Sequence, residues 1–437
     1  MLRKVILLCV APALLSAQGA TVSDSARPIS VQEAVRLAQE NNVSAITAEN
    51  SIRSAQNQVR TARAQLYPSL NASAGQTNSA GSRVGPGGTI IGYNSGWTYN
   101  TGLNSSITLF DGGKTFADVR ARQADVAAAQ AGQTTTEFGL AAQVKTQYNL
   151  ILAAKESEAA ALAQLALAQQ QLATSIAKVN AGAASVSDSL RNVVAVANAQ
   201  VAILNAQQGA RTASAALTRL VGTPYLVTAQ ASDTVDAPLA PIDSAAILQQ
   251  ALDGPVIRQT QAQVNSAGAA VRSSRSAYWP SVRANLSYGG SGTAPYGLMS
   301  DSSHLFPYSR SIGLSFSYPL FNNFQRETQI SASQIVLENA QATLKDQRLA
   351  AQQNIITQLG ALRNAEERIR VQQLNVTASE EDLRVNQQRY ALGASTMVDV
   401  LTSQSALITA RQQLIQARLD YRNARAQIEA IIGHDLP

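Results

Sequence analysis

The residues best placed to do chemistry lie in a turn that occurs twice in the chain, at positions 179–190 and 390–401. The two copies share three residue types 211 positions apart: Gly182 and Gly393, Asp188 and Asp399, Leu190 and Leu401. The glycine suits the left-handed residue that ends a helix. Each aspartate stands three positions after a Ser or Thr, which is the capping-box pattern that starts the next helix. We therefore predict a tight helix–turn–helix, made twice.

Catalytic chemistry has no comparable signal. We find no nucleophile–base pair, no phosphate-binding loop and no metal-ligand spacing. The two histidines, His304 and His434, have no neighbouring cluster of Cys, His or carboxylates, so we predict neither a metal nor a cofactor. We expect a protein that is not an enzyme and has no catalytic residue.

An internal duplication covers nearly the whole chain. A predicted helix over 29–65 is stopped by Pro68, and a helix from about 244 is stopped by Pro280, 212 positions later. We therefore divide the chain into a first repeat, 21–222, and a second repeat, 244–437. The linker, 223–243, is predicted to be irregular with one short strand near 225–227.

The hydrophobic period changes from helical to two after each proline. It predicts β-hairpins over 69–110 and 281–320, with loops around 76–95 and 289–308. Aromatic residues that could mark a membrane interface stand near the strand ends: Trp97, Tyr99, Tyr288, Tyr308 and Tyr318. A solvated hairpin is the simpler interpretation. However, a strand needs roughly 9–11 residues to span a bilayer, and the predicted strands approach this length, which favours a membrane β-barrel. Four strands cannot close a barrel, because the smallest have about eight, so two or three chains must combine.

A very long helix is predicted to follow each hairpin. Apolar residues recur every seven positions in the second repeat, at 355, 362, 369, 376, 383 and 390, and in the first at 144, 151, 165, 172 and 179, with Glu158 breaking the series. This period indicates coiled-coil-like packing. The run from Gly113 to Gly182 would be about 100 Å long at about 1.5 Å per residue.

The composition suits thin layers of helix and an exported protein. Aromatic residues make up only 5% of the 437 residues, and the formal charge of +6 forms no dense basic patch, so no nucleic-acid partner is predicted. Residues 1–20 have the basic start, apolar stretch and small residues of a signal peptide. Cys9, the only cysteine, lies inside that apolar stretch, so we expect no disulfide.

Taken together, these motifs resemble the TolC family of outer membrane efflux proteins over essentially the full mature length. The resemblance rests on the duplication, on YPSL at 67–70, on LFDGG at 109–113 and above all on RYxxGxxxxxDVL at 389–401. It implies a mainly α fold with a membrane β-barrel: four strands per chain, a homotrimer with a twelve-stranded barrel in the bacterial outer membrane, and a long helical tunnel in the periplasm. The implied partners are a periplasmic adaptor protein, an inner-membrane transporter and outer membrane lipid.

The resemblance also implies roles at the repeated turn. Asp399 matches a carboxylate that rings the pore entrance, while Tyr390 and Asp188 match residues whose contacts hold the entrance shut. Ser395 and Thr402 stand where the best-known member has an arginine and a second acid, so the contacts that close the entrance are expected to differ. The tip turns that would contact the adaptor comprise Gly182, Ala183, Leu190, Gly393, Ala394 and Leu401. Each residue also has a plain structural role, with the aspartates as helix caps and Tyr390 as core packing.

Two other functions stay open at this point. A periplasmic coiled-coil scaffold without a pore would explain the helices but not the alternating strands. A passive porin would explain the strands but would have no use for the long helices.

Overall fold

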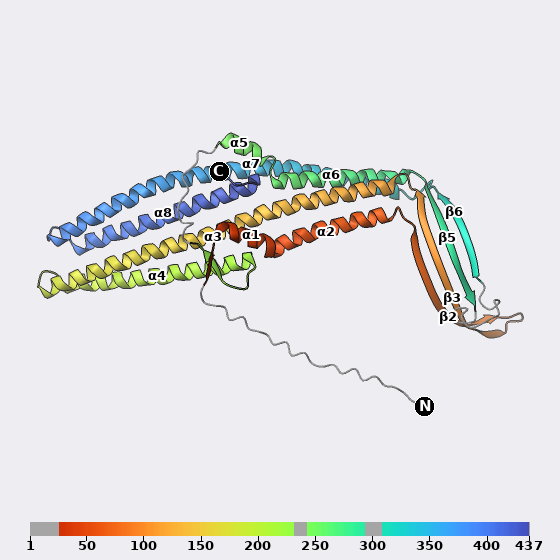
Figure 1. Cartoon of the computed structure of the whole chain (residues 1–437), viewed down its shortest axis with the longest axis horizontal. Helices are drawn as coiled ribbons and strands as arrows, with labels where there is room; N and C mark the ends of the chain where they lie inside the picture. The colour runs from red at the N-terminus through yellow and green to blue at the C-terminus, as the bar shows by residue number, and fades with distance from the viewer. Residues whose placement is uncertain (1–25, 231–242, 293–307, 437) are drawn as a thin grey trace, which may run out of the picture. The chain divides into compact units, whose positions relative to one another are not determined.

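The computed structural model describes residues 26–230, 243–292 and 308–436 (Figure 1). The predicted signal peptide, 1–20, lies outside the described residues, as do parts of the linker 223–243 and of the loop 289–308. The chain divides into two compact units. The first contains residues 1–42, 143–239 and 364–423, and the second contains the rest.

Helices dominate the described ranges. In chain order the elements are β1 (Arg27–Ile29), α1 (Val31–Asn41), α2 (Val43–Ala64), β2 (Ser69–Val84), β3 (Ile90–Phe110), α3 (Lys114–Asn180), α4 (Val186–Val221), β4 (Val227–Ala229), α5 (Ser244–Ala251), α6 (Pro255–Arg275), η2 (Ser276–Tyr278), β5 (Ser281–Gly292), β6 (Tyr308–Ser317), α7 (Gln325–Ala391) and α8 (Met397–Ile432).

The long helices confirm the length predicted from the run between Gly113 and Gly182. α3 and α7 each contain 67 residues without a break, which corresponds to about 100 Å. Each leads through a short turn into a helix of 36 residues, α4 or α8. None of the helices in the described ranges combines the length and hydropathy needed to cross a membrane.

The helices that open each repeat are broken, although the sequence was read as one helix in each case. α1 ends where Asn42 adopts an extended backbone, and the Asn42 side-chain amide donates to the carbonyl of Leu220 at 2.8 Å. In the second repeat, Pro255 starts α6 because proline is favoured at the first helical position. Gly254 precedes it, and a Cβ there would lie 2.2 Å from the carbonyl oxygen of Ile431. Short polar or glycine-containing segments therefore divide both helices.

The core of the first unit forms where α3 and α4 pack on a small parallel sheet. β1 pairs with β4, with Arg27 opposite Val227. Tyr148 of α3 is fully buried, and its hydroxyl donates to the carbonyl of Ile29 and accepts from the N–H of Gln230, both at 3.0 Å. One tyrosine thus joins the ends of both strands to the long helix. The sequence had predicted a strand near 225–227 but not its partner β1.

Burial along the long helices follows the predicted heptad positions in α7 and in the first part of α3, where Val144 and Ile151 are fully buried. Heptad positions of α7, such as Ile355 and Leu362, are buried. In α3 the seam shifts by three residues toward the turn: Ala168 and Ser175 are fully buried, while Leu165 and Leu172 are half-buried. Glu158, which interrupts the heptads, accepts a hydrogen bond from Gln207 at 2.9 Å. Residues 165, 172 and 179 are therefore half-buried, as Val376 and Tyr390 are in α7.

The second unit contains an open, antiparallel sheet with the strand order β2-β3-β5-β6. The strands are longer than expected: β2 runs to Val84 and β3 begins at Ile90, so most of the predicted loop 76–95 is strand. The inner pairing places Leu103 opposite Tyr288. β2 and β6 are the two edges, and neither has an outer partner within the described residues.

The two faces of this sheet differ in polarity, as the alternation predicted. Serines on one face bond across the strands, with Ser69 Oγ 2.9 Å from Ser106 Oγ and Ser287 Oγ 2.7 Å from Ser311 Oγ. Large apolar side chains on the other face stay exposed: Leu70, Trp97, Leu103, Leu286, Tyr288, Ile312, Leu314 and Phe316. This sheet therefore has an apolar surface with no cover from the described chain.

Candidate functional site

The two turns have the predicted backbone geometry. Gly182 and Gly393 are left-handed, with φ of 72° and 75°. The N–H of Ala183 donates to the carbonyl of Lys178, and that of Ala394 to the carbonyl of Arg389, both at 2.8 Å. These are the closing bonds of a Schellman motif. A Cβ on either glycine would meet nothing within 4 Å, so the glycine is needed for its backbone conformation rather than for space.

The capping box of the second turn is complete. The N–H of Thr396 donates to Asp399 Oδ2 at 2.8 Å, and the N–H of Asp399 donates to Thr396 Oγ1 at 3.3 Å. The hydroxyls of Thr396 and Ser395 also donate to Oδ2, at 2.8 and 3.2 Å. The Thr396 N–H, followed by the Thr396 hydroxyl, lowers the pKa of Asp399. The three bonds that reach the carboxylate all end on Oδ2, so Oδ1 of this exposed carboxylate has no protein donor among the described residues.

The first turn does not form the predicted capping box. Ser185 caps α4 by accepting from the N–H of Ser187 at 3.2 Å. The half-buried carboxylate of Asp188 makes no hydrogen bond within the described ranges. It lies close enough to Tyr390 to influence that residue's titration. Asp188 and Tyr390 are therefore brought together, whereas Asp188 and Ser185 are not paired through their side chains.

Lys178 makes the main polar contact between the two turns, and the sequence had not singled it out. From the last turn of α3, its ammonium donates to the carbonyl of Tyr390 at 3.0 Å and lies 4.2 Å from the centre of the Tyr390 ring. A cation at this carbonyl also faces the negative end of α7. The sequence shows only a lysine near the end of a predicted helix. By itself, this position predicts a favourable interaction with the helix dipole but no contact with the other turn.

Tyr390 contributes its ring rather than its hydroxyl. The hydroxyl is buried and has no hydrogen-bond partner among the described residues. Its burial, and secondarily the negative charge of Asp188, raise the pKa of Tyr390. The ring packs against a buried cluster beneath the turn, formed by Leu383, Met397, Val400 and Leu407, with Leu167, Val376 and Leu401 at its border.

Ser395 and Thr402 make only local bonds. Ser395 joins the Asp399 cap, and the Thr402 hydroxyl donates to the carbonyl of Val398 at 2.9 Å, within its own helix. The turn residues at 181–183 and 391–394 are exposed. Leu190 is 60% exposed, whereas Leu401 is half-buried against the core cluster. The equivalent leucines of the two repeats thus have different surroundings.

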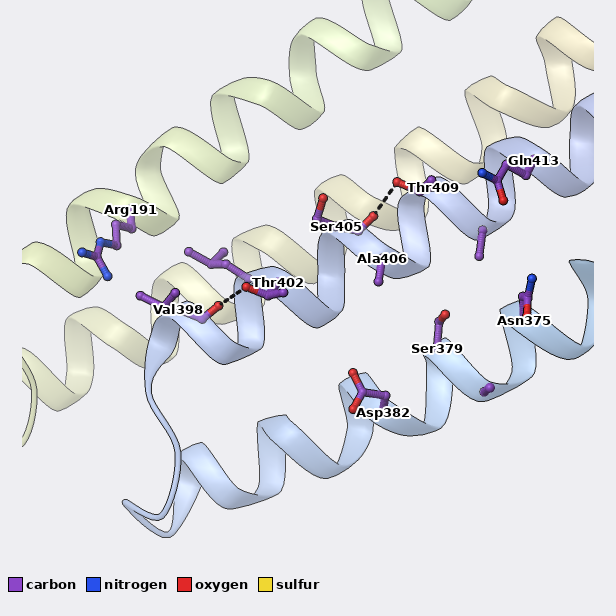
Figure 2. Close-up of a pocket in the computed structure, with 13 residues that line it drawn as sticks. Arg191, Asn375, Ser379, Asp382, Val398, Thr402, Ser405, Ala406, Thr409 and Gln413 are labelled. Carbon is purple, nitrogen blue, oxygen red and sulfur yellow. Dashed lines mark hydrogen bonds between the residues drawn. The ribbon is translucent and has the colours of Figure 1, made fainter.

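A groove of 1110 Å³ runs along α8 from this turn (Figure 2). Its walls come from α7 and α8 and from Arg191 of α4: Asn375, Ala378, Ser379, Asp382, Val398, Leu401, Thr402, Ser405, Ala406, Thr409, Ala410 and Gln413. Figure 2 shows Arg191 on α4 and Asp382 on α7, with Thr402 on α8 between these helices. Neither Arg191 nor Asp382 had been predicted, because only tertiary packing brings them to one surface.

Four of the five predicted interface aromatics belong to the sheet. Tyr288 and Tyr308 stack with ring centres 5.6 Å apart. Trp97 and Tyr99 lie within β3 rather than at its end, because that strand begins at Ile90. Tyr318 follows the last residue of β6 and is exposed. In the described residues, no group of three or more His, Cys, Asp or Glu side chains is arranged to hold a metal ion.

The duplication is also the pattern of a known family. The family model described as "Outer membrane efflux protein" matches residues 34–223 and 247–434, which are the two repeats. The chain belongs to this family. Its members are channel proteins rather than enzymes, and the family and its named relatives indicate an outer-membrane location.

Individual relatives agree with this assignment. The pyoverdine export outer membrane protein OpmQ of Pseudomonas aeruginosa is 25% identical over 388 residues, covering 87% of this chain and 79% of OpmQ. TolC of Escherichia coli is 25% identical over 150 residues, or 34% of this chain and 30% of TolC. The crystal structure of CusC has a TM-score of 0.77 at 20% identity and covers 94% of each chain. The fold is therefore that of the solved TolC-like channels.

Proposed function

We propose that this outer membrane efflux protein is the exit duct of an export system, assembled as a homotrimer. Three copies of the four-stranded sheet would close a twelve-stranded barrel in the bacterial outer membrane, and the long helices would form a periplasmic tunnel. A periplasmic adaptor and an inner-membrane transporter would deliver the substrate. The observation that carries this proposal is the match of both repeats to the family, together with an open sheet that has one exposed apolar face.

The sheet supports assembly and membrane insertion. Its edge strands β2 and β6 leave backbone N–H and C=O groups unpaired, and such edges invite pairing with another chain. In a bilayer these groups must be paired, which closure into a barrel achieves. The exposed apolar face would then meet lipid, and the serine-rich face would line a polar lumen.

The repeated turn supports a gated entrance. Asp399 keeps Oδ1 without a protein donor while Oδ2 caps α8, so one carboxylate can both start the helix and present charge to cations. Ser395 stands where the best-known family member has an arginine, and Lys178 would supply the cation instead. It connects α3 to the end of α7 through the carbonyl and ring of Tyr390. Asp188 would act on this contact as a nearby negative charge rather than as a hydrogen-bond acceptor.

The groove along α8 supports docking of the adaptor. It combines polar side chains, such as Ser379, Ser405 and Gln413, with exposed small residues, and it begins beside the second turn. Exposed apolar side chains on α4, including Val186, Leu190 and Val194, extend the surface of the first turn. Both features fit a partner that meets the helix ends from the periplasm.

The proposal is tested by membrane fractionation and by planar-bilayer conductance. We expect the full-length protein in the outer membrane fraction, as a trimer, and discrete channel openings after reconstitution. Recovery as a soluble periplasmic protein without conductance would instead indicate a scaffold.

A further inference from the structure

A cation with two aromatic neighbours stands out on the apolar face of the sheet. Arg310 of β6 lies directly opposite Tyr288 of β5. Tyr308, two residues before Arg310, shares its face and stacks on Tyr288 with the ring planes 9° apart. All three side chains are exposed. They form one small surface at the N-terminal end of β6.

The rest of this face of β6 is apolar. Ile312, Leu314 and Phe316 follow Arg310 in alternation and are 84%, 72% and 70% exposed. In a lipid-facing position, a charged side chain costs about 2–4 kcal/mol at the bilayer midplane but only about 0–1 kcal/mol near the interface. Arg310 stands at the end of the apolar series, where a charged side chain near the membrane interface costs little.

The sheet offers no anion to this guanidinium. The sequences of β2, β3, β5 and β6 contain no Asp or Glu. Arg310 forms no ion pair with any described residue. Arg283 of β5 lies on the opposite, serine-rich face, where its pairing partner is Ser315. Arg310 is thus a cation at an apolar boundary with no anionic partner among the described residues.

We propose that Tyr288, Tyr308 and Arg310 bind the phosphate group of a membrane lipid headgroup. This inference rests on the proposed function, since it requires the apolar face to meet a bilayer. The planar guanidinium matches the oxygens of a phosphate in a bidentate manner. Tyrosine rings are favoured at the level of lipid headgroups because one end of the ring is apolar and the other polar. The apolar residues below, Ile312 to Phe316, would contact the acyl chains of the same lipid.

A lipid titration tests the proposal on the full-length, detergent-purified protein. Native mass spectrometry would count lipids retained from diphosphoryl lipid A and from the same glycolipid without phosphate. Because each basic residue near a membrane surface contributes about 1 kcal/mol, we expect Arg310→Gln to weaken retention of the phosphorylated lipid about fivefold. Arg310→Lys should fall between the two. The matched control, Arg283→Gln, removes an arginine from the neighbouring strand on the polar face and should leave retention unchanged.

Three outcomes would overturn the inference. Equal retention by the wild type and Arg310→Gln would remove Arg310 from the site. Equal retention of the lipid without phosphate would show that acyl contacts alone suffice. Displacement of the lipid by inorganic phosphate would mean a site for the free ion. Conductance of each sample separates these outcomes from failure of the proposed function, since a wild-type protein without channel activity would contradict the duct itself.

Discussion

Replacing Lys178 by methionine tests the contact between the two turns. The substitution keeps an unbranched side chain of similar length but removes the ammonium that lies 3.0 Å from the Tyr390 carbonyl and 4.2 Å from its ring. A hydrogen bond from a charged donor contributes about 1.5–3 kcal/mol, and a cation–π contact about 0.5–2 kcal/mol. Holding a lysine side chain costs up to about 2 kcal/mol of entropy. The net loss is about 0–3 kcal/mol per protomer, and its midpoint of about 1.5 kcal/mol changes the closed-to-open ratio about tenfold.

Single-channel recording in planar bilayers measures this change directly. Lys178→Met should spend a larger fraction of time open than the wild type, and Lys178→Arg should stay near the wild type because it keeps the charge and can lie over the ring. Lys155→Met is the matched control: it removes another partly buried lysine of α3, whose ammonium donates to the carbonyl of Ala229 at 2.6 Å. An open fraction in Lys178→Met that equals the wild type would refute the reasoning.

Three further changes address the same site. Tyr390→Phe should leave gating unchanged and the free energy of unfolding equal or slightly higher, because the lost hydroxyl is buried without a hydrogen-bond partner among the described residues. Increased channel opening, measured as conductance, would show that the assembly supplies a hydrogen-bond partner for this hydroxyl. Asp399→Asn keeps an acceptor for the cap but removes the charge, so the reversal potential should lose cation selectivity, whereas an unchanged value would leave Asp399 as a cap only. The pKa of Asp399 in the folded protein is below its ordinary value of 3.8. The ionised carboxylate therefore stabilises α8 fully above pH 3.8, and this stabilisation is lost as the pH falls through the folded pKa. Hydrogen exchange at the start of α8 should rise in that acidic range in the wild type but not in Asp399→Asn. Gly393→Val should cost about 1–3 kcal/mol at a left-handed residue and weaken adaptor binding in a pull-down, with Gly393→Ala less affected and insertion normal in both.

Features set by neighbouring residues were predictable from the sequence. The left-handed glycines and the Thr396 to Asp399 box need only a few adjacent residues, and both formed as expected. The alternation along β3 and β6 likewise predicted a sheet with one apolar face. The first turn shows the limit of such patterns, since Ser185 bonded to Ser187 instead of forming a box with Asp188.

Features that depend on distant packing were not predictable. Lys178 and Tyr390 are 212 positions apart, and no local pattern connects a lysine to the end of another helix. The break at Asn42 depends on the carbonyl of Leu220, which a helical pattern over 29–65 does not show. The hairpin over 69–110 was predicted, but the full length of β2 and β3 was not, because Gly, Ser and Asn dominate 76–95. Such residues in a strand are stabilised by their neighbours in the sheet rather than by propensity.

The two repeats share a backbone plan but differ in how their helix pairs hold buried polar groups. In the second, Ser403 donates to Asp382 at 2.5 Å and Asn386 donates to the same carboxylate at 3.1 Å, which ties α8 to α7. The positions 211 residues earlier are Gln171 and Asn192, whose side-chain amides are buried without a partner among the described residues. An unsatisfied buried group costs about 1–3 kcal/mol. Local opening of α3 and α4 would restore water to these amides. Opening of α7 and α8 would do the same for the buried amide of Gln404 and the hydroxyl of Tyr390, but it would also break the network at Asp382.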